Sequence, residues 1–450
     1  MKKWMYMVTV CLIVGSLFSS CGRTDEQRMK ILKIYNWADY IDEEVLDDFT
    51  YWYKEQTGED IRIIYQVFDI NEIMLTKIER GHEDFDVVCP SEYIIERMLK
   101  KDLLLPIERN FGNTPDYTGN IAPYIREQLD KISQPGHRAN DYSVAYMWGT
   151  AGLLYNKAFV TEEEVESWSC LWDPKYRGKI LMKDSYRDAY GTAIIYAHAE
   201  ELEAGTVTVE KLMNNYSPEA IALAEQYLKD MKPNIAGWEA DFGKEMMTKN
   251  KAWINFTWSG DAVWAIEEAE AVNVELDYEV PVEGSNIWYD GWVIPKYARN
   301  VKAASYFINY LCRPDIALRN MDEIGYVSAV ATPEILEAKI DSTLTDYYDL
   351  SYFFGEGAER IPIDPVQYPD YEVVRRCAMI RDFGDQTDLV LEMWSRVKGD
   401  NLNTGIVLLI FLVFGFLFVW LAWQKIRKYK QRQRHRSRRR SHRKLIKWKE

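Results

Sequence analysis

The chain has 450 residues, 47% of them hydrophobic, with 16 Trp and 30 Tyr, which excludes a disordered protein and predicts two domains or lobes. The formal charge of −15 is unevenly distributed, because residues 425–450 hold 14 basic residues and one acidic residue. The rest of the chain has 41 basic and 69 acidic residues, a charge of −28, which favours a cationic small ligand over nucleic acid.

The N-terminus has the plan of a secretory signal. In MKKWMYMVTVCLIVGSLFSSCG, a charged start precedes an apolar centre and small residues. We predict a signal peptide over residues 1–20, and the FSSC sequence that ends at Cys21 resembles the lipidation box of bacterial lipoproteins. Cys21 is therefore the predicted lipid attachment site, with an ordinary signal anchor as the alternative.

Strand and helix patterns alternate from Ile31 onward. ILKIYNW, DIRIIYQVF and DFDVVCPS predict strands, while EEVLDDFTYWYKEQTG and NEIMLTKIERG predict helices that end at Gly58 and Gly81. Further along, SPEAIALAEQYLKDM predicts a helix capped by Ser217, and AASYFINYLCRPDIALRNM predicts a helix broken near Pro314. The alternation predicts an α/β fold with a parallel sheet covered by helices on both faces.

The C-terminal part of the chain predicts a membrane-spanning helix. GIVLLIFLVFGFLFVWLAW, residues 405–423, is uncharged and has about the 20 residues that a span needs. The basic tail 424–450 follows, so the positive-inside rule places the tail in the cytoplasm and the acidic body in the periplasm. The tail is expected to lie against anionic membrane lipid, and no motif supports nucleic-acid binding. A buried soluble helix is the alternative interpretation.

Cysteine and histidine spacing does not indicate a cofactor. The cysteines that follow Cys21 are far apart in sequence, and the five histidines have no spacing typical of metal ligands. We therefore expect no metal, no cofactor and no catalytic residues.

Polar and aromatic residues recur where predicted strands end. YNWADY follows the first strand, PSEY follows DVVC and WSGD follows AWINFT, while IWYDGWVIP places Asp290 among large aromatic side chains. Ligands of open α/β sheets bind at the carboxyl ends of strands, so these clusters predict one binding site. An ionised carboxylate in such surroundings needs a cation, which either the protein or a ligand supplies.

The ordered set YNWADYI, DVVCPSEYIIERM, SWSCLWDPKYRGKILM, WSGDAVW, WYDGWVIP and EIGYVSA resembles bacterial periplasmic spermidine/putrescine-binding proteins over about Ile31 to Lys398. The resemblance implies a two-lobed α/β periplasmic binding protein of type II-like fold, with a hinge and with a polyamine bound between the lobes. It implies delivery of the polyamine to an ABC-type permease in the inner membrane. The predicted lobes are residues 31–145 with 290–334, and residues 146–289 with 335–398.

The resemblance also implies the residues that bind the ligand. The family pattern places aromatic walls, amine-binding acids and hydroxyl partners at Trp37, Asp39, Tyr40, Ser91, Tyr93, Asp188, Trp258, Asp261, Trp288, Asp290 and Tyr326. This chain departs from the pattern at Ala38, where relatives often have a hydroxyl residue, and at Ser185, where spermidine binders tend to carry an acid. The resemblance associates Asp261 with putrescine-type relatives, so the lost acid at Ser185 together with the retained Asp261 favours the shorter diamine putrescine over spermidine.

Several alternatives remain open at the level of sequence. Trp37 and Trp288 can be core aromatics, Asp261 can cap the helix that SGDAVWAIEEAE begins, and Asp188 can pair with Arg187. A polyamine-sensing receptor subunit is a second functional class, although few residues follow the predicted span. A carbohydrate-binding or glycoside-hydrolysing protein also combines carboxylates with aromatic walls. The body is expected to be monomeric.

Overall fold

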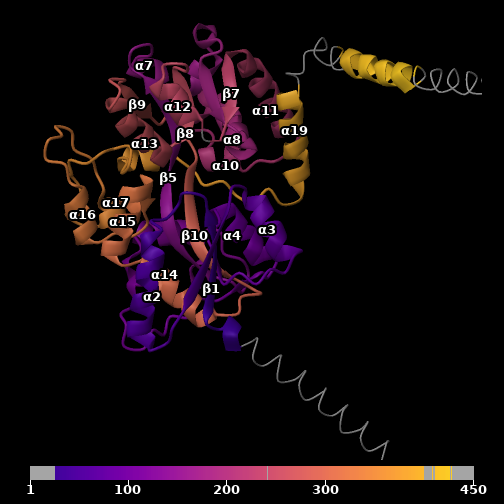
Figure 1. Ribbon diagram of the computed structural model, residues 1–450. Helices are drawn as coiled ribbons and strands as arrows, with labels where there is room; N and C mark the ends of the chain where they lie inside the picture. The colour runs from indigo at the N-terminus through magenta and orange to yellow at the C-terminus, as the bar shows by residue number, and fades with distance from the viewer. Residues whose placement is uncertain (1–25, 241, 400–407, 409–410, 426, 428–450) are drawn as a thin grey trace, which may run out of the picture. The chain divides into compact units, whose positions relative to one another are not determined.

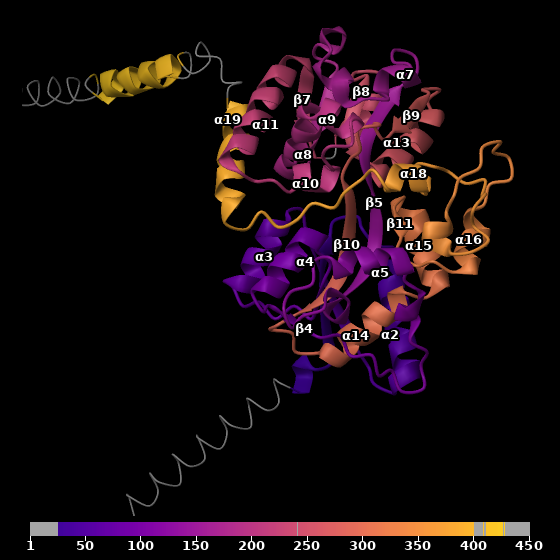
Figure 2. The same cartoon turned by 180° about the vertical axis from the view of Figure 1, so that it is seen from behind.

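The computed structural model describes residues 26–240, 242–399, 408, 411–425 and 427. The chain forms two compact units, Met1–Leu391 and Glu392–Glu450, and the sheet and the candidate site belong to the first unit. Figures 1 and 2 show this unit as two groups of helices and strands, with β5 (Ser143–Asn156) and β10 (Ile287–Pro295) running through the middle.

One sheet of 11 strands connects the two groups, in the order β2-β1-β3-β10-β5-β8-β6-β7, with β11 and β9 paired to β5 and β4 paired to β10. The other strands are β1 (Ile31–Trp37), β2 (Arg62–Phe68), β3 (Val87–Val88), β4 (Leu104–Leu105), β6 (Ile180–Lys183), β7 (Ile235–Glu239), β8 (Ile254–Trp258), β9 (Leu276–Glu279) and β11 (Val327–Ser328).

Helices cover both groups of strands (Figure 1). Their bounds are α2 (Glu44–Thr57), α3 (Asn71–Glu79), α4 (Glu92–Lys100), α5 (Pro123–Asp130), α6 (Ala139–Tyr142), α7 (Glu162–Val165), α8 (Tyr186–Ala197), α9 (Ala199–Glu203), α10 (Val209–Met213), α11 (Pro218–Met231), α12 (Gly243–Thr248), α13 (Ser259–Glu270), α14 (Val301–Leu311), α15 (Pro314–Ile324), α16 (Pro333–Lys339), α17 (Ser351–Phe354), α18 (Tyr371–Val374) and α19 (Thr387–Gly399).

The long strand β5 passes from one group of strands to the other. Its first part, Ser143–Thr150, pairs antiparallel with β10. Its second part pairs antiparallel with β8 and β9. All residues of β5 are buried, which is why its sequence is almost continuously apolar and lacks strand alternation.

Most predicted elements are confirmed. The first predicted strand coincides with β1, and α2 ends against Gly58, which has a φ of 75° and donates its N–H to the Lys54 carbonyl. Ser217 caps α11 by accepting from the backbone N–H of Ala220 at 3.2 Å, and Pro314 begins α15 after α14 ends. The helix predicted to end at Gly81 ends earlier, at Glu79.

The prediction of a parallel sheet is wrong for its centre. β1 pairs parallel with β2 and β3, and β6 pairs parallel with β7 and β8, but β10 and β5 run antiparallel to their neighbours. β5 and β10 are far apart in the chain, so the direction in which they pair cannot be read from the local sequence. The sheet is therefore mixed.

The larger hydrophobic core draws on residues 32–148 and 287–379. A second core cluster draws mainly on residues 154–280. Ile335, Leu350, Phe353 and Tyr368 belong to the larger core, so the sequence-based lobe boundary at residue 335 does not follow the hydrophobic core. The lobe bounds otherwise stay a prediction.

Several predictions near the termini fall on residues that the structure does not describe. The signal peptide 1–20, Cys21 and most of the tail 424–450 lie outside the described residues, as do parts of the predicted span 405–423. Residues 411–425 are helical. In the part of the chain that the structure describes, no helix is both long enough and apolar enough to cross a membrane.

Candidate functional site

Asp290 lies inside β10, where the pairing register with β5 shifts between Tyr289 and Gly291. It therefore does not follow the end of a strand, as the sequence suggested, but sits at an irregularity that breaks the ladder. The side chain is buried, and its Oδ2 accepts a hydrogen bond from the Tyr40 hydroxyl at 2.8 Å. Ser91, at the start of α4, forms an isolated bridge with Asp290.

The Asp290 carboxyl lacks a cationic partner. Its Oδ1 is buried without a hydrogen-bond partner, and no ion pair between described residues includes it. Burial raises the pKa of Asp290 from 3.8 to about 6, although hydrogen bonds from Ser91 and Tyr40 act in the opposite direction. A bound cation beside this carboxyl would lower the pKa and remove the cost of its ionisation.

A second buried carboxyl, Glu92, lies near Asp290, and a third, Asp188, lies near Glu92. Glu92 begins α4, is 1% exposed, and accepts the backbone N–H of Tyr289 through its Oε2 at 3.0 Å. Burial raises its pKa well above the ordinary range, and the neighbouring charges of Asp290 and Asp188 raise it further. We call Asp290, Glu92 and Asp188 the carboxyl cluster.

Asp188 reaches the cluster from the other group of strands. It lies in the first turn of α8, is buried, and its Oδ1 accepts from the Asn286 amide at 3.1 Å. Burial raises its pKa, against hydrogen bonds from Ser185, Asn286 and Trp258. The alternative in which Asp188 pairs with its neighbour Arg187 is not what the structure shows, because Arg187 pairs with Glu72 instead.

Glu92 is the member of the carboxyl cluster that sequence reasoning missed. It follows Ser91 directly in PSEY, yet an acid in the first turn of a helix is already explained by the helix dipole. Its burial and its proximity to Asp290, nearly 200 residues further along, cannot be read from the local sequence.

Aromatic rings surround Asp290. The rings of Tyr40 and Tyr326 lie 5.4 Å apart, and those of Trp288 and Tyr326 also lie 5.4 Å apart, both nearly edge to face. Tyr326 packs on the backbone of Gly260, where an added Cβ would lie 2.3 Å from the ring. The indole nitrogens of Trp37 and Trp288 are buried without a hydrogen-bond partner.

Tyr93 is already in contact with a protein cation. The Arg187 guanidinium lies 3.9 Å from the centre of the Tyr93 ring, and the Tyr93 hydroxyl accepts from the Asn71 amide at 2.8 Å. Arg187 also pairs with Glu72 of α3 at 3.2 Å, and the Tyr186 hydroxyl donates to the same carboxylate at 2.7 Å. These contacts join α3 and α4 to α8 across the two groups of strands.

Asp261 and Asp39 differ from the carboxyl cluster. Asp261 lies in the first turn of α13 without capping it, and its carboxylate pairs with Lys183 at 2.8 Å and with Lys244 at 3.3 Å. Asp39 is exposed, with a φ of 51°. Trp258 ends β8 beside Asp261, with Lys183 over its ring. Amine binding by Asp261 and Asp39 stays a prediction, and the two lysines argue against it for Asp261.

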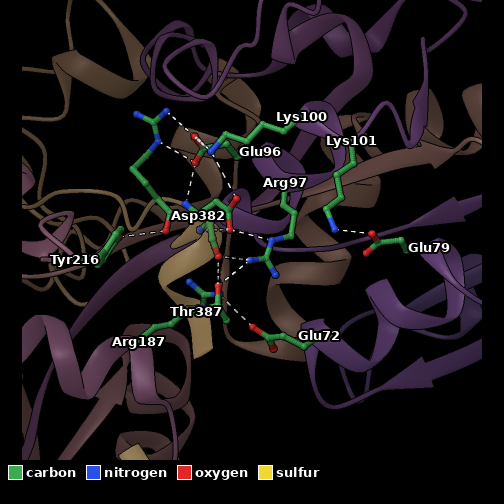
Figure 3. A network of polar contacts seen from close by, with 12 residues as sticks. Glu72, Glu79, Glu96, Arg97, Lys100, Lys101, Arg187, Tyr216, Asp382 and Thr387 are labelled. Atoms are coloured by element: carbon green, nitrogen blue, oxygen red, sulfur yellow. Dashed lines mark hydrogen bonds and ion pairs between the residues drawn. The ribbon is translucent and has the colours of Figure 1, made fainter. Parts of the chain in front are cut away.

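A second polar network lies beside the site (Figure 3). Glu96 of α4 accepts two hydrogen bonds from the Arg381 guanidinium, at 3.0 and 2.9 Å, and Arg97 pairs with Asp382 at 3.0 Å. The backbone N–H of Arg381 donates to Asn214 at 2.9 Å. The segment around residue 381 therefore contacts α4 and the residues after α10, so that it too connects the two groups of strands.

Two surface cavities, of about 430 and 370 Å³, are lined by other residues, around Trp172 and around Arg126 respectively. Among the described residues, no group of three His, Cys, Asp or Glu side chains could hold a metal ion. The candidate site is thus identified by its buried carboxyls and aromatic rings and not by an open cavity.

The sequence profile of the bacterial extracellular solute-binding proteins matches residues 46–341. The chain belongs to this family. The solute-binding protein is 27% identical over 402 residues to the spermidine/putrescine-binding periplasmic protein of Escherichia coli, an alignment that covers 88% of this chain and 99% of the relative. It is 29% identical over 346 residues to the putrescine-binding periplasmic protein PotF of the same organism, covering 74% and 86% of the two chains.

Solved structures agree with this assignment. The solute-binding protein matches a putative spermidine/putrescine ABC transporter protein from Listeria monocytogenes with a TM-score of 0.64 at 29% identity, covering 82% of this chain and 99% of the other. It matches the substrate-binding protein PotD of Streptococcus pneumoniae with a TM-score of 0.61 at 31% identity, covering 82% and 98%. The predicted periplasmic-binding-protein fold is therefore confirmed, with a mixed sheet and helices that are consistent with two lobes, and its type II-like form and hinge stay predictions.

Proposed function

We propose that this protein binds a polyamine and delivers it to an ABC-type permease, without chemical change to the ligand. The observation that carries the proposal is a cluster of three buried carboxyls with aromatic walls, in which Asp290 has no cationic partner among the described residues. The relatives, which include spermidine/putrescine-binding and putrescine-binding proteins, support the same ligand class.

The chemistry of the site suits a polyamine. Such a ligand has ammonium groups separated by methylenes, and carboxylates bind ammonium groups through charge-assisted hydrogen bonds. The rings of Tyr40, Trp288 and Tyr326 offer apolar surface for methylenes and π faces for cations, each worth about 0.5–2 kcal/mol. We assign one ammonium to Asp290 and the other to Asp188, with the predicted tryptophans and Tyr40 and Tyr93 as walls and Ser91 and Tyr326 as hydroxyl partners.

Capture by closure of two lobes accounts for the contacts across the site. Glu72 of α3 binds Tyr186 and Arg187 of α8, and Glu96 of α4 binds Arg381. Such contacts form when the lobes approach and separate when they open, which is the mechanism of hinge closure around a ligand. We propose the same lobe bounds as the sequence predicts, 31–145 with 290–334 and 146–289 with 335–398. Several buried side chains of residues 335–374 nevertheless pack in the larger hydrophobic core, together with the first of these lobes.

Attachment to the membrane is a separate part of the proposal. The FSSC sequence supports a lipid on Cys21, and the uncharged residues 405–423 followed by a basic tail support a membrane span. Tethering on the periplasmic side of the inner membrane would raise the effective concentration of the binding protein at its permease.

A thermal-shift panel tests the proposed function. The full-length protein in detergent is melted alone and with putrescine, cadaverine, spermidine, spermine, amino acids and oligosaccharides. Binding to the folded state raises the melting temperature, and at a ligand concentration of 100 times Kd the stabilisation is about 2.7 kcal/mol. The proposal expects stabilisation by at least one polyamine and none by the oligosaccharides. Stabilisation by an oligosaccharide with no response to any amine would overturn it.

A further inference from the structure

Lys183 is a lysine buried inside the protein. It ends β6 and is 2% exposed. Its ammonium lies 2.8 Å from Asp261 Oδ2 and 3.0 Å from Glu239 Oε1, and it donates to the Ala240 carbonyl at 2.9 Å. These contacts use the three N–H groups that a lysine ammonium possesses.

The same ammonium lies 4.8 Å from the centre of the Trp258 ring. Lys183 thus has a carboxylate on one side and an indole face on another, which are the two partners that the site offers to a ligand ammonium. The partners themselves, Trp258 and Asp261, are residues that the resemblance to polyamine-binding proteins places at the ligand.

Lys183 and the carboxyl cluster belong to one region. The positive charge of Lys183 lowers the pKa of Asp188, against the larger effect of burial, and Trp258 also interacts with the Asp188 carboxyl. Gly260 lies between Trp258 and Asp261 in WSGD. The ring of Tyr326 packs on the Gly260 backbone and also contacts the ring of Trp288. The lysine therefore lies at the end of the site formed by WSGD.

The two ends of the site differ in charge. Burial would raise the pKa of Asp261, but the charges of Lys183 and Lys244 outweigh it, and the pKa lies below its ordinary value. Asp290 has no such lysine, and its pKa is raised to about 6. One acid of the site is therefore compensated by the protein, and the other is left for a ligand.

On the basis of the proposed function, we propose that the ammonium group of Lys183 occupies the end of the polyamine site formed by WSGD. There it takes the place of a ligand ammonium, so that the site binds a diamine in preference to longer polyamines. Glu92 accepts a backbone N–H and is shielded from water, so Asp188 and Asp290 are the carboxylates left to the ligand, matching the two charges of a diamine. A third ammonium would meet Lys183, and like charges at a buried site repel strongly.

Lys183→Met tests the proposal, because it removes the ammonium and keeps the length of the side chain. Affinities for putrescine and spermidine are measured by calorimetry on the full-length protein in detergent. The ratio of spermidine to putrescine affinity is expected to rise at least tenfold in the variant. Lys179→Met is the matched control, since Lys179 also lies over an indole ring, that of Trp253 at 4.9 Å, and its substitution should leave the ratio unchanged.

Removing Lys183 alone leaves Glu239 and Asp261 under-compensated, so the single variant can fail to fold. Lys183→Met with Glu239→Gln removes one charge of each sign and keeps the local balance. An unchanged ratio in a folded variant overturns the role of Lys183 while putrescine binding still supports the proposed function. If the wild-type protein binds spermidine more tightly than putrescine, the proposed role of Lys183 is overturned whatever the variants show. Binding of neither amine by the wild type overturns the proposed function itself.

Discussion

Replacing Asp290 by asparagine separates a ligand-binding carboxylate from a structural one. The amide keeps the shape and an acceptor for the Tyr40 hydroxyl, which now donates to Asp290 at 2.8 Å, but it removes the charge. Hydrogen bonds to charged groups contribute about 1.5–3 kcal/mol, so putrescine affinity should fall about tenfold to more than a hundredfold.

The stability of the ligand-free protein should change in the opposite direction. The pKa of Asp290 rises from an ordinary 3.8 to about 6 on folding, which corresponds to about 3 kcal/mol of destabilisation once the carboxyl is ionised. The folded state binds the proton of Asp290 more tightly than the unfolded state does. The resulting contribution to stability is fully present below about pH 4 and is lost as the pH rises through 6. At pH 7.5, Asp290→Asn should therefore melt at the same or a higher temperature than the wild type.

Ligand affinity should depend on pH with the reverse sign. An ammonium binds the ionised carboxylate, so putrescine affinity should fall about tenfold for each pH unit below 6, and this dependence should weaken in Asp290→Asn. Calorimetric titrations at pH 5, 6 and 7.5, with melting curves at the same pH values, measure both effects.

Asp86→Asn is the matched control, because Asp86 is a fully buried aspartate that does have a cation, Arg28, at 2.9 Å. Breaking such a pair leaves a buried charge, so this variant should lose about 3–5 kcal/mol of stability and keep its affinity for putrescine. The reasoning about Asp290 is refuted if Asp290→Asn behaves like this control, melting early and binding putrescine normally.

Three further outcomes are expected. Glu92→Gln should flatten the fall in ligand-free melting temperature as the pH rises above the ordinary glutamate pKa of 4.5, because the folded state holds the Glu92 proton more tightly than the unfolded state; an unchanged slope contradicts this. Gly260→Ala should lower putrescine affinity at least tenfold by displacing Tyr326, whereas Gly119→Ala, with no atom within 4 Å of the added Cβ, should not; equal affinities contradict the packing. Truncation before residue 401 should leave the protein in the membrane fraction. Cys21→Ser combined with this truncation should release the protein. If the doubly altered protein stays in the membrane fraction, it has another attachment.

The order of elements was predictable because its signals are local. Apolar periodicity and caps such as Gly58 and Ser217 fix where helices and strands begin and end. The mixed sheet was not predictable, because the paired strands β5 and β10 are more than 100 residues apart in the sequence. A fully buried strand also lacks the alternation that would reveal its partners.

The candidate site was predictable in its residue types and not in its charge balance. Asp290 and Asp261 look alike in sequence, each beside a tryptophan and a glycine. The structure separates them through Lys183, which is 78 residues from Asp261 and has no local signal for this contact. Glu92 was missed for the same reason, because only the fold brings its carboxyl to the backbone of Tyr289.

The decisive measurement is a calorimetric titration of the full-length protein with putrescine at pH 6, run in two buffers of different ionisation enthalpy. We expect one putrescine to bind per chain with release of protons, because Asp290, whose pKa is raised to about 6, is partly protonated at this pH and the bound ammonium lowers its pKa. An absence of binding by putrescine and by every other polyamine, with heat from an oligosaccharide instead, would contradict it.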